Sequence, residues 1–302
     1  MANVIVTGAS TGIGRAIALD LHRRGWSVLA GVRRKVDGAD LLAAAKANES
    51  NANSATTAGG RLQPLHLDIT NADDLAASTK IAAEFCGDAG LQVLINNAGI
   101  VVPGPLEFLP LDGFRKQLDV NTTGALAATQ QFLPLLRLAA ASKPSHKPRI
   151  LMVSSISGRV GTPMVGAYNA SKFALEGMSD ALRRELLSHG IDVVLIEPGA
   201  IATPIWRTTS IRAQRMEPEF PQQSNEIYAP FVQSLRNNLP KIEKRAIPAE
   251  RVAEVVYTAV SIRRPKARYL IGTDAKMGAW LQRLLPTRWF DRLIVWDALR
   301  NN

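Results

Sequence analysis

The sequence contains a single cysteine, Cys86, among its 302 residues. No internal disulfide can form, which agrees with a reducing compartment. Aromatic residues make up only 6%, and the four histidines are scattered, with no HExxH pattern and no Cys/His cluster. We therefore predict that the protein holds no metal.

Long hydrophobic runs are also absent. No stretch reaches about 18 uninterrupted apolar residues, the length that suggests a membrane-spanning helix. Only Met1 and Ala2 precede the first apolar run, without a basic segment, so no targeting peptide is expected. We predict a cytoplasmic protein.

The overall composition is that of an ordinary globular protein, 46% hydrophobic and 21% charged. This excludes disordered, collagen-like and repeat proteins. The net charge of +10 would attract anionic ligands, nucleic acid or an anionic membrane, and does not choose among them. The sequence contains no nucleic-acid-binding motif, so no nucleic-acid partner is expected.

Short apolar runs alternate along the chain with longer helical patterns. Continuous apolar runs are typical of strands buried on both faces of a parallel sheet. We predict one Rossmann-type domain over residues 1–302, an α/β fold with a doubly wound, mostly parallel sheet of about seven strands and helices on both faces. The predicted strands are 4–6, 28–30, 65–67, 93–95, 150–153, 193–196 and 269–271. The predicted helices include 15–24, 73–85, 114–138, 168–188 and 248–262.

Two segments depart from this alternation. Residues 48–60 are rich in Asn, Ala, Ser, Thr and Gly and predict a flexible surface loop. Residues 203–245 lack strand signals, contain five prolines and follow a predicted strand. Because α/β folds place ligand-covering loops after strands, we interpret residues 203–245 as a mobile substrate lid.

A glycine-rich turn joins the first strand to the first helix, Thr7-Gly8-Ala9-Ser10-Thr11-Gly12-Ile13-Gly14. Glycines allow the backbone to approach a pyrophosphate, and the helix N-terminus offers free N–H groups. The order of strand, glycines and helix predicts a dinucleotide site; an ordinary strand-to-helix turn is the alternative. The candidate contacts here are Gly8, Ser10, Thr11, Gly12, Ile13 and Gly14.

The end of the second strand indicates which dinucleotide binds. NAD enzymes usually place a carboxylate here for the ribose 2′-hydroxyl, but this chain has Val32 followed by Arg33 and Arg34. Arginine forms bidentate bonds with phosphate, so we predict NADP (NADPH), with NAD as second choice. A solvated basic turn is the alternative, and Asp37 and Asp40 are misplaced acceptors for a 2′-hydroxyl.

Tyr168 and Lys172 form a YxxxK pattern, which places the ammonium near the phenol on one face of a helix. A nearby cation favours the phenolate and lowers the pKa of a tyrosine toward the range of acid–base catalysis. Ser155 lies thirteen residues before Tyr168, at the end of a predicted strand. On its own, YxxxK also fits a pair on a surface helix.

Together these motifs resemble the short-chain dehydrogenase/reductase family, over residues 3–205. The 3+1 spacing of the glycines, Asn96-Asn97-Ala98-Gly99 and Pro198-Gly199-Ala200-Ile201-Ala202-Thr203 carry the resemblance. It implies that Asp68 contacts adenine and that Thr203 holds the nicotinamide carboxamide. The other contacts implied by these motifs are Asn97, Ala98, Gly99, Pro198, Gly199 and Ile201.

The resemblance also implies a catalytic tetrad of Asn121, Ser155, Tyr168 and Lys172. Tyr168 would be the general acid/base, Ser155 would bind the substrate oxygen, and Lys172 would bind the nicotinamide ribose. Asn121 would support a proton relay and, with Tyr168 and Lys172, also contact the cofactor. The implied reaction is hydride transfer between NADP(H) and a carbonyl carbon. A catalytically silent regulator or scaffold that binds a dinucleotide is the alternative.

The expected substrate wall is apolar and contains no charged anchor, which predicts a small hydrophobic alcohol or ketone. Its candidate residues are Val101, Val102, Pro103, Ile156, Met164, Val165, Ile205 and Trp206. Residues 30–33 and 197–206 resemble the branch that includes the hydroxysteroid and retinol dehydrogenases.

Residues 263–302 form a basic, Trp-containing C-terminal extension with nine basic and three acidic residues. Pro286 predicts two short amphipathic helices, 279–285 and 287–299. Trp289, Leu293 and Trp296 would share one face of the second. We expect protein to cover this face, beside the lid or in a homodimer or homotetramer. Peripheral contact with an anionic membrane is the alternative.

Overall fold

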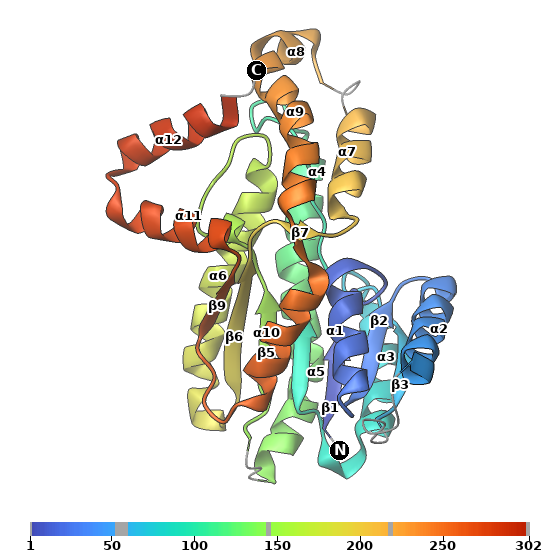
Figure 1. Cartoon of the computed structure of the whole chain (residues 1–302). Coiled ribbons are helices and arrows are strands. Elements are labelled where there is room, and N and C mark those ends of the chain that lie inside the picture. The colour runs from blue at the N-terminus through green and yellow to red at the C-terminus, as the bar shows by residue number, and fades with distance from the viewer. Residues whose placement is uncertain (1, 52–59, 143–145, 217–219, 300–302) are drawn as a thin grey trace.

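A seven-stranded parallel sheet forms the centre of the protein (Figure 1). The computed structural model describes residues 2–51, 60–142, 146–216 and 220–299. The strand order is β3-β2-β1-β4-β5-β6-β9, which confirms the predicted doubly wound sheet. The strands are β1 (Asn3–Val6), β2 (Ser27–Val32), β3 (Leu62–His66), β4 (Val93–Asn96), β5 (Arg149–Val153), β6 (Asp192–Pro198) and β9 (Arg268–Ile271).

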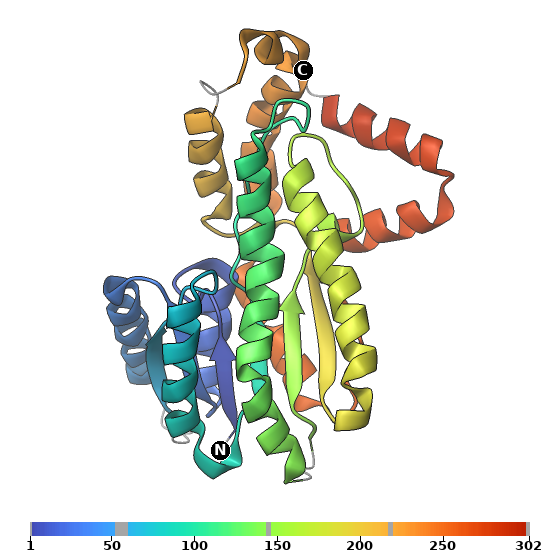
Figure 2. The same ribbon diagram turned by 180° about the vertical axis from the view of Figure 1, so that it is seen from behind.

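Helices cover both faces of this sheet, as its continuous apolar strands require. On one face lie α1 (Gly12–Arg23), α2 (Lys35–Asn51) and α10 (Ala249–Ser261) (Figure 1). On the other face lie α3 (Ala72–Cys86), α5 (Gly124–Ala141) and α6 (Gly166–Glu185) (Figure 2). Each face has its own apolar core, so the sheet is buried between two layers of helices.

The strand order reverses between β1 and β4, which are neighbours in the sheet. The chain leaves β1 toward β2 and β3, and continues from β4 in the opposite direction. Ligands of open α/β sheets bind outside the carboxyl ends of the strands at such a switch point. The glycine-rich turn follows β1 and the Asn-Asn-Ala-Gly segment follows β4, so both motifs lie at this point.

The predicted helix 114–138 is interrupted. It consists of α4 (Leu111–Leu118), a π-helical turn (Asp119–Thr123) and α5. Such single π-turns occur often at functional sites. This one contains Asn121, which is buried.

The segment 203–245 is helical rather than a loop. It contains α7 (Ile205–Met216), α8 (Gln222–Ile227) and α9 (Ala229–Arg245), and lies beyond the carboxyl ends of the strands (Figures 1 and 2). A short ribbon of β7 (Ile201–Ala202) and β8 (Ile247–Pro248) closes its base. Pro221 precedes α8 and Pro230 lies in the first turn of α9, where proline is tolerated. Residues 217–219 lie outside the described residues.

The predicted loop 48–60 is wrong at its start, because α2 continues to Asn51. Residues 52–59 of that loop lie outside the described residues. The prediction placed no helix at 35–51, where the sequence has almost no amphipathic pattern.

The C-terminal extension forms two helices that separate at Pro286, as predicted. They are α11 (Thr273–Leu284) and α12 (Thr287–Leu299), and they project from the body of the protein (Figure 1). α12 meets α9, where the Ser234 hydroxyl donates to the Ala298 carbonyl. Within the part of the chain that the structure describes, Trp289 and Trp296 are nevertheless 67% and 58% exposed. Among the described helices, none is both long and apolar enough to cross a membrane.

Candidate active site

The turns after β1 and β4 pack directly against each other. A Cβ atom at Gly8 would lie 2.8 Å from Ala98 Cα, and one at Gly14 would lie 2.3 Å from Asn97 Nδ2. Asn97 Nδ2 donates to the carbonyls of Thr7 (2.9 Å) and Gly8 (3.1 Å). Gly8 also has a φ of 65°, which favours glycine. This exposed backbone at the N-terminus of α1 fits the pyrophosphate of a dinucleotide.

The two arginines after β2 differ in their partners. Arg34 forms a two-point ion pair with Asp37 through Nε (2.9 Å) and a terminal nitrogen (2.5 Å). Arg33 is exposed, and its NH1 atom lies 3.9 Å from Asp68 Oδ2. Asp37 is therefore already paired with Arg34. Arg33 has only a long ion pair with Asp68, so Arg33 is the better placed of the two to bind a phosphate.

A third arginine, Arg212 on α7, reaches the same region from the helical segment 203–245. Its NH1 atom donates to the Val101 carbonyl, a few residues beyond the β4 turn. Burial lowers the pKa of Arg212, and the nearby charge of Arg33 lowers it further. Sequence reasoning missed this residue, because the segment was interpreted as a loop without a binding motif.

Three members of the predicted tetrad meet where β5 ends and α6 begins. Lys172 follows Tyr168 by one turn of α6, and its Nζ atom lies 5.6 Å from the centre of the Tyr168 ring. The same Nζ atom donates to the Val153 carbonyl at 2.8 Å, two residues before Ser155. The Ser155 hydroxyl lies within range of the Tyr168 phenol and lowers its pKa.

Asn121 joins the group through the backbone of the β4 turn and through α6. Its Oδ1 atom accepts from the Ile100 amide at 2.8 Å, and its Nδ2 atom donates to the Ile100 carbonyl at 3.0 Å. The Nδ2 atom also donates to Ser171 Oγ at 3.0 Å, next to Lys172 in sequence. The structure thus brings Asn121, Ser155, Tyr168 and Lys172 into one site.

Burial shifts the ionisation of the two central groups in opposite directions. It raises the pKa of the Tyr168 phenol, although Ser155 opposes this shift. It lowers the pKa of Lys172 to about 8, and the Glu176 carboxylate opposes that shift. Positive charge near the phenol is therefore needed before Tyr168 can lose its proton near neutral pH.

The Pro-Gly segment after β6 faces the glycine-rich turn. A Cβ atom at Gly12 would lie 3.1 Å from Thr203 Cγ2. The Ala200 amide donates to Asp274 Oδ2 at 2.8 Å, which ties this segment to the start of α11. Asp274 was not predicted; it lies 74 residues from Ala200, and nothing in the local sequence marks the pairing.

Val102 and Met164 belong to the predicted substrate wall. Val102 is buried in a small apolar cluster with Met216 and Phe220 of the segment 203–245. Met164 has a φ of 69°, which is unusual for a side chain of its size, and its carbonyl accepts from the Gly104 amide at 2.8 Å. Strained backbone of this kind often lies at ligand sites.

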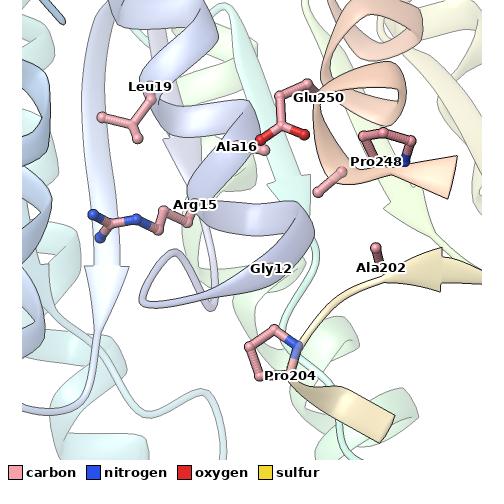
Figure 3. A pocket seen from close by; sticks show the side chains of 9 residues that line it. Gly12, Arg15, Ala16, Leu19, Ala202, Pro204, Pro248 and Glu250 are labelled. Atoms are coloured by element: carbon pink, nitrogen blue, oxygen red, sulfur yellow. The ribbon is translucent and has the colours of Figure 1, made fainter. Parts of the chain in front are cut away.

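A groove of about 340 Å³ lies between α1, the ribbon of β7 and β8, and the start of α10 (Figure 3). It reaches the glycine-rich turn only at Gly12, and no tetrad residue lines it. We therefore do not assign it to the reaction. Its lining residues are Gly12, Arg15, Ala16, Leu19, Ala202, Pro204, Pro248, Ala249 and Glu250.

Known proteins resemble this chain over most of its length. The sequence model of the short chain dehydrogenase family matches residues 2–214. The NADPH-dependent 3-dehydrocapnine reductase of Ornithobacterium rhinotracheale is 33% identical over 98% of this chain and 97% of its own length. Retinol dehydrogenase 16 of Mus musculus is 34% identical over 98% of this chain and 89% of its own length.

A solved structure shows the same fold. A short chain dehydrogenase from Burkholderia cenocepacia, in complex with NADP, matches with a TM-score of 0.67 and 24% identity, over 99% of this chain and 97% of that one.

Proposed function

The chain belongs to the short-chain dehydrogenase/reductase family, and from this premise we propose that it transfers a hydride between NADP(H) and a hydrophobic alcohol or ketone. The observation that carries the proposal is the complete tetrad. Asn121, Ser155, Tyr168 and Lys172 come from three separate segments (the π-helical turn, the end of β5 and helix α6), and contacts within the core hold them together. A silent dinucleotide-binding protein has no need of all four.

The chemical roles follow from the atoms that each residue presents. The nicotinamide supplies the hydride when it is bound. Tyr168 donates a proton to the developing alkoxide during reduction, or removes the hydroxyl proton during oxidation. Ser155 donates a hydrogen bond to the same substrate oxygen and stabilises its charge. Lys172 places a positive charge beside the phenol, and Asn121 fixes the helix that carries Lys172.

NADP is the proposed cofactor because Arg33 is exposed and has no close acidic partner in the described chain; its nearest carboxylate is 3.9 Å away. A guanidinium so placed suits a 2′-phosphate. The similar reductase from Ornithobacterium rhinotracheale is named as NADPH-dependent, which supports this choice. NAD remains the second choice, and Arg212 is a further cation on the same side of the site.

The substrate proposal depends on the apolar cluster of Val102, Met216 and Phe220 under the lid. Similar proteins named as retinol dehydrogenases support a hydrophobic alcohol or aldehyde. Residues 203–245 act as the substrate lid in this proposal, and the exposed face of α12 is covered by a second subunit. Contact of that face with an anionic membrane is the alternative.

A screen of NADPH oxidation tests the function. Purified protein is offered retinal, ketosteroids, and aliphatic or aromatic ketones, and loss of NADPH absorbance is followed. Oxidation that requires one of these carbonyls, and that Tyr168→Phe abolishes, supports the proposal. If NADPH binds tightly and no carbonyl in these classes is reduced, the silent regulator is favoured instead.

A further inference from the structure

Glu176 places a carboxylate inside the protein one helical turn beyond Lys172. Tyr168, Lys172 and Glu176 follow one another at intervals of four on α6, so all three lie on one face of the helix. Lys172 is 5% exposed and Glu176 is 8% exposed. Burying a carboxylate is costly unless partners compensate it, and the YxxxK motif does not account for its presence.

A set of ion pairs fixes this carboxylate. Glu176 Oε2 lies 3.1 Å from Arg268 NH2 on β9. Arg268 also reaches Glu197 on β6 through Nε (3.3 Å) and Asp180 on α6 through NH1 (3.0 Å). Arg159 binds Glu197 at two points, 2.7 and 2.8 Å. Because Arg268 is shared among three carboxylates, it compensates Glu176 only in part.

The second oxygen of Glu176, Oε1, accepts no well-formed hydrogen bond from the residues that the structure describes, and the buried Ser154 hydroxyl lies beside this carboxylate. Both side chains border Gly158: a Cβ atom there would lie 2.8 Å from Ser154 Oγ and 2.9 Å from Glu176 Cγ. This glycine therefore allows close packing between the end of β5 and α6.

Lys172 needs such a counter-charge. The one hydrogen bond of its Nζ atom within the described chain goes to a neutral carbonyl, that of Val153. Burial lowers the pKa of Lys172 to about 8, and Glu176 raises it. Burial in turn raises the pKa of Glu176 to about 7; Ser154, Arg268 and Arg159 lower it, and Glu197 raises it further. The Glu176 carboxylate therefore stabilises the charged form of Lys172.

We propose that Glu176 is a positioning residue that keeps Lys172 charged and directed at Val153 and the Tyr168 phenol, with Arg268 and Glu197 holding the carboxylate in place. The proposal deepens the proposed function, since it rests on the role given there to Lys172. In this arrangement the charge of Glu176 controls how readily Tyr168 loses its proton.

Nuclear magnetic resonance of the full chain, labelled with ¹³C at the lysine ε-carbon and without dinucleotide, measures the pKa of Lys172 directly. The Lys172→Arg variant identifies the resonance. The test variant is Glu176→Gln, and the matched control is Asp180→Asn, which removes a carboxylate one turn further along α6 that also pairs with Arg268. We expect Glu176→Gln to lower the pKa of Lys172 by about one unit and Asp180→Asn to leave it unchanged.

An unchanged pKa of Lys172 in Glu176→Gln overturns the proposal, and so does an equal fall in both variants, because Arg268 would then be responsible. If Glu176→Gln does not fold, the titration of Lys172 in the wild-type protein tests the proposal instead. Its Lys172 resonance must show a second inflection at about pH 7, where Glu176 titrates, and a single inflection overturns the proposal. These titrations need no turnover, so they succeed or fail separately from the NADPH-oxidation screen.

Discussion

Asp274 accepts a hydrogen bond from the Ala200 amide at 2.8 Å and so connects the first turn of α11 to the Pro-Gly segment of the cofactor site. The contact leaves no room for a side chain at Gly199, where a Cβ atom would lie 2.1 Å from Asp274 Oδ2. The Asp274 carboxylate thus joins the C-terminal extension to the site, although the helices of the extension project away from the sheet.

We expect Asp274→Ala to raise the Kd for NADPH by about tenfold, because a hydrogen bond to a charged group contributes roughly 1.5–3 kcal/mol and the freed segment must be ordered again on binding. Fluorescence titration with NADPH measures the change. Asp291→Ala on α12 removes an exposed carboxylate of the same extension and is the control. Equal affinities in both variants would show that Ala200 is held in place without Asp274.

Tyr168→Phe tests the acid/base. Loss of the hydroxyl should lower kcat by about 100-fold or more, since proton transfer typically contributes 10²- to 10⁴-fold. The ring remains beside Lys172, so binding of NADPH should persist. Steady-state rates on whichever carbonyl the screen identifies, together with NADPH titration, provide the measurement. Near-normal turnover in this variant would refute the assignment.

Arg33 and Arg34 form a natural pair of test and control for the choice of cofactor. Arg33→Ala should weaken NADPH binding by about tenfold and leave NADH nearly unchanged, because a charge-assisted bond to the 2′-phosphate is lost. Arg34→Ala should have a smaller effect, since Arg34 is already paired with Asp37. The Kd values for both dinucleotides settle the question; wild-type protein that binds both equally would contradict the prediction.

Lys172 should make dinucleotide binding depend on pH. The ammonium donates to the ribose only while protonated, and its pKa is lowered to about 8. Affinity for NADPH should therefore be highest below this value and fall as the pH rises through about 8. Lys172→Met should bind more weakly and lose this inflection. An inflection of the same size in Lys172→Met would assign the titration to another group.

The sheet was predictable because its strands are continuous apolar runs, and the site because its motifs lie at strand ends that a parallel sheet brings together. Arg212, Asp274 and Glu176 could not be predicted in this way. Each acts through a partner distant in sequence or through burial, as Asp274 does with Ala200 and Glu176 with Arg268. The helices of residues 203–245 were not predicted, because prolines at helix starts, such as Pro221 and Pro230, have the same local signature as a loop.

The exposed face of α12 is part of a larger apolar surface. Trp280 on α11 is 60% exposed, and with Trp289 and Trp296 it forms an apolar surface on the projecting helices. Such a surface is unfavourable in water unless something covers it. We expect a second subunit to do so. Removal of residues 279–302 should then reduce the mass measured by light scattering, or lower Tm, while Asp274 and its bond to Ala200 remain.

The double variant Trp289→Ser, Trp296→Ser keeps the full chain and changes only this face, so it is the matched control for the truncation. It should reduce the measured mass in the same way. Unchanged mass and Tm in the truncated chain, together with binding of the full chain alone to anionic vesicles, would show that lipid covers this face instead.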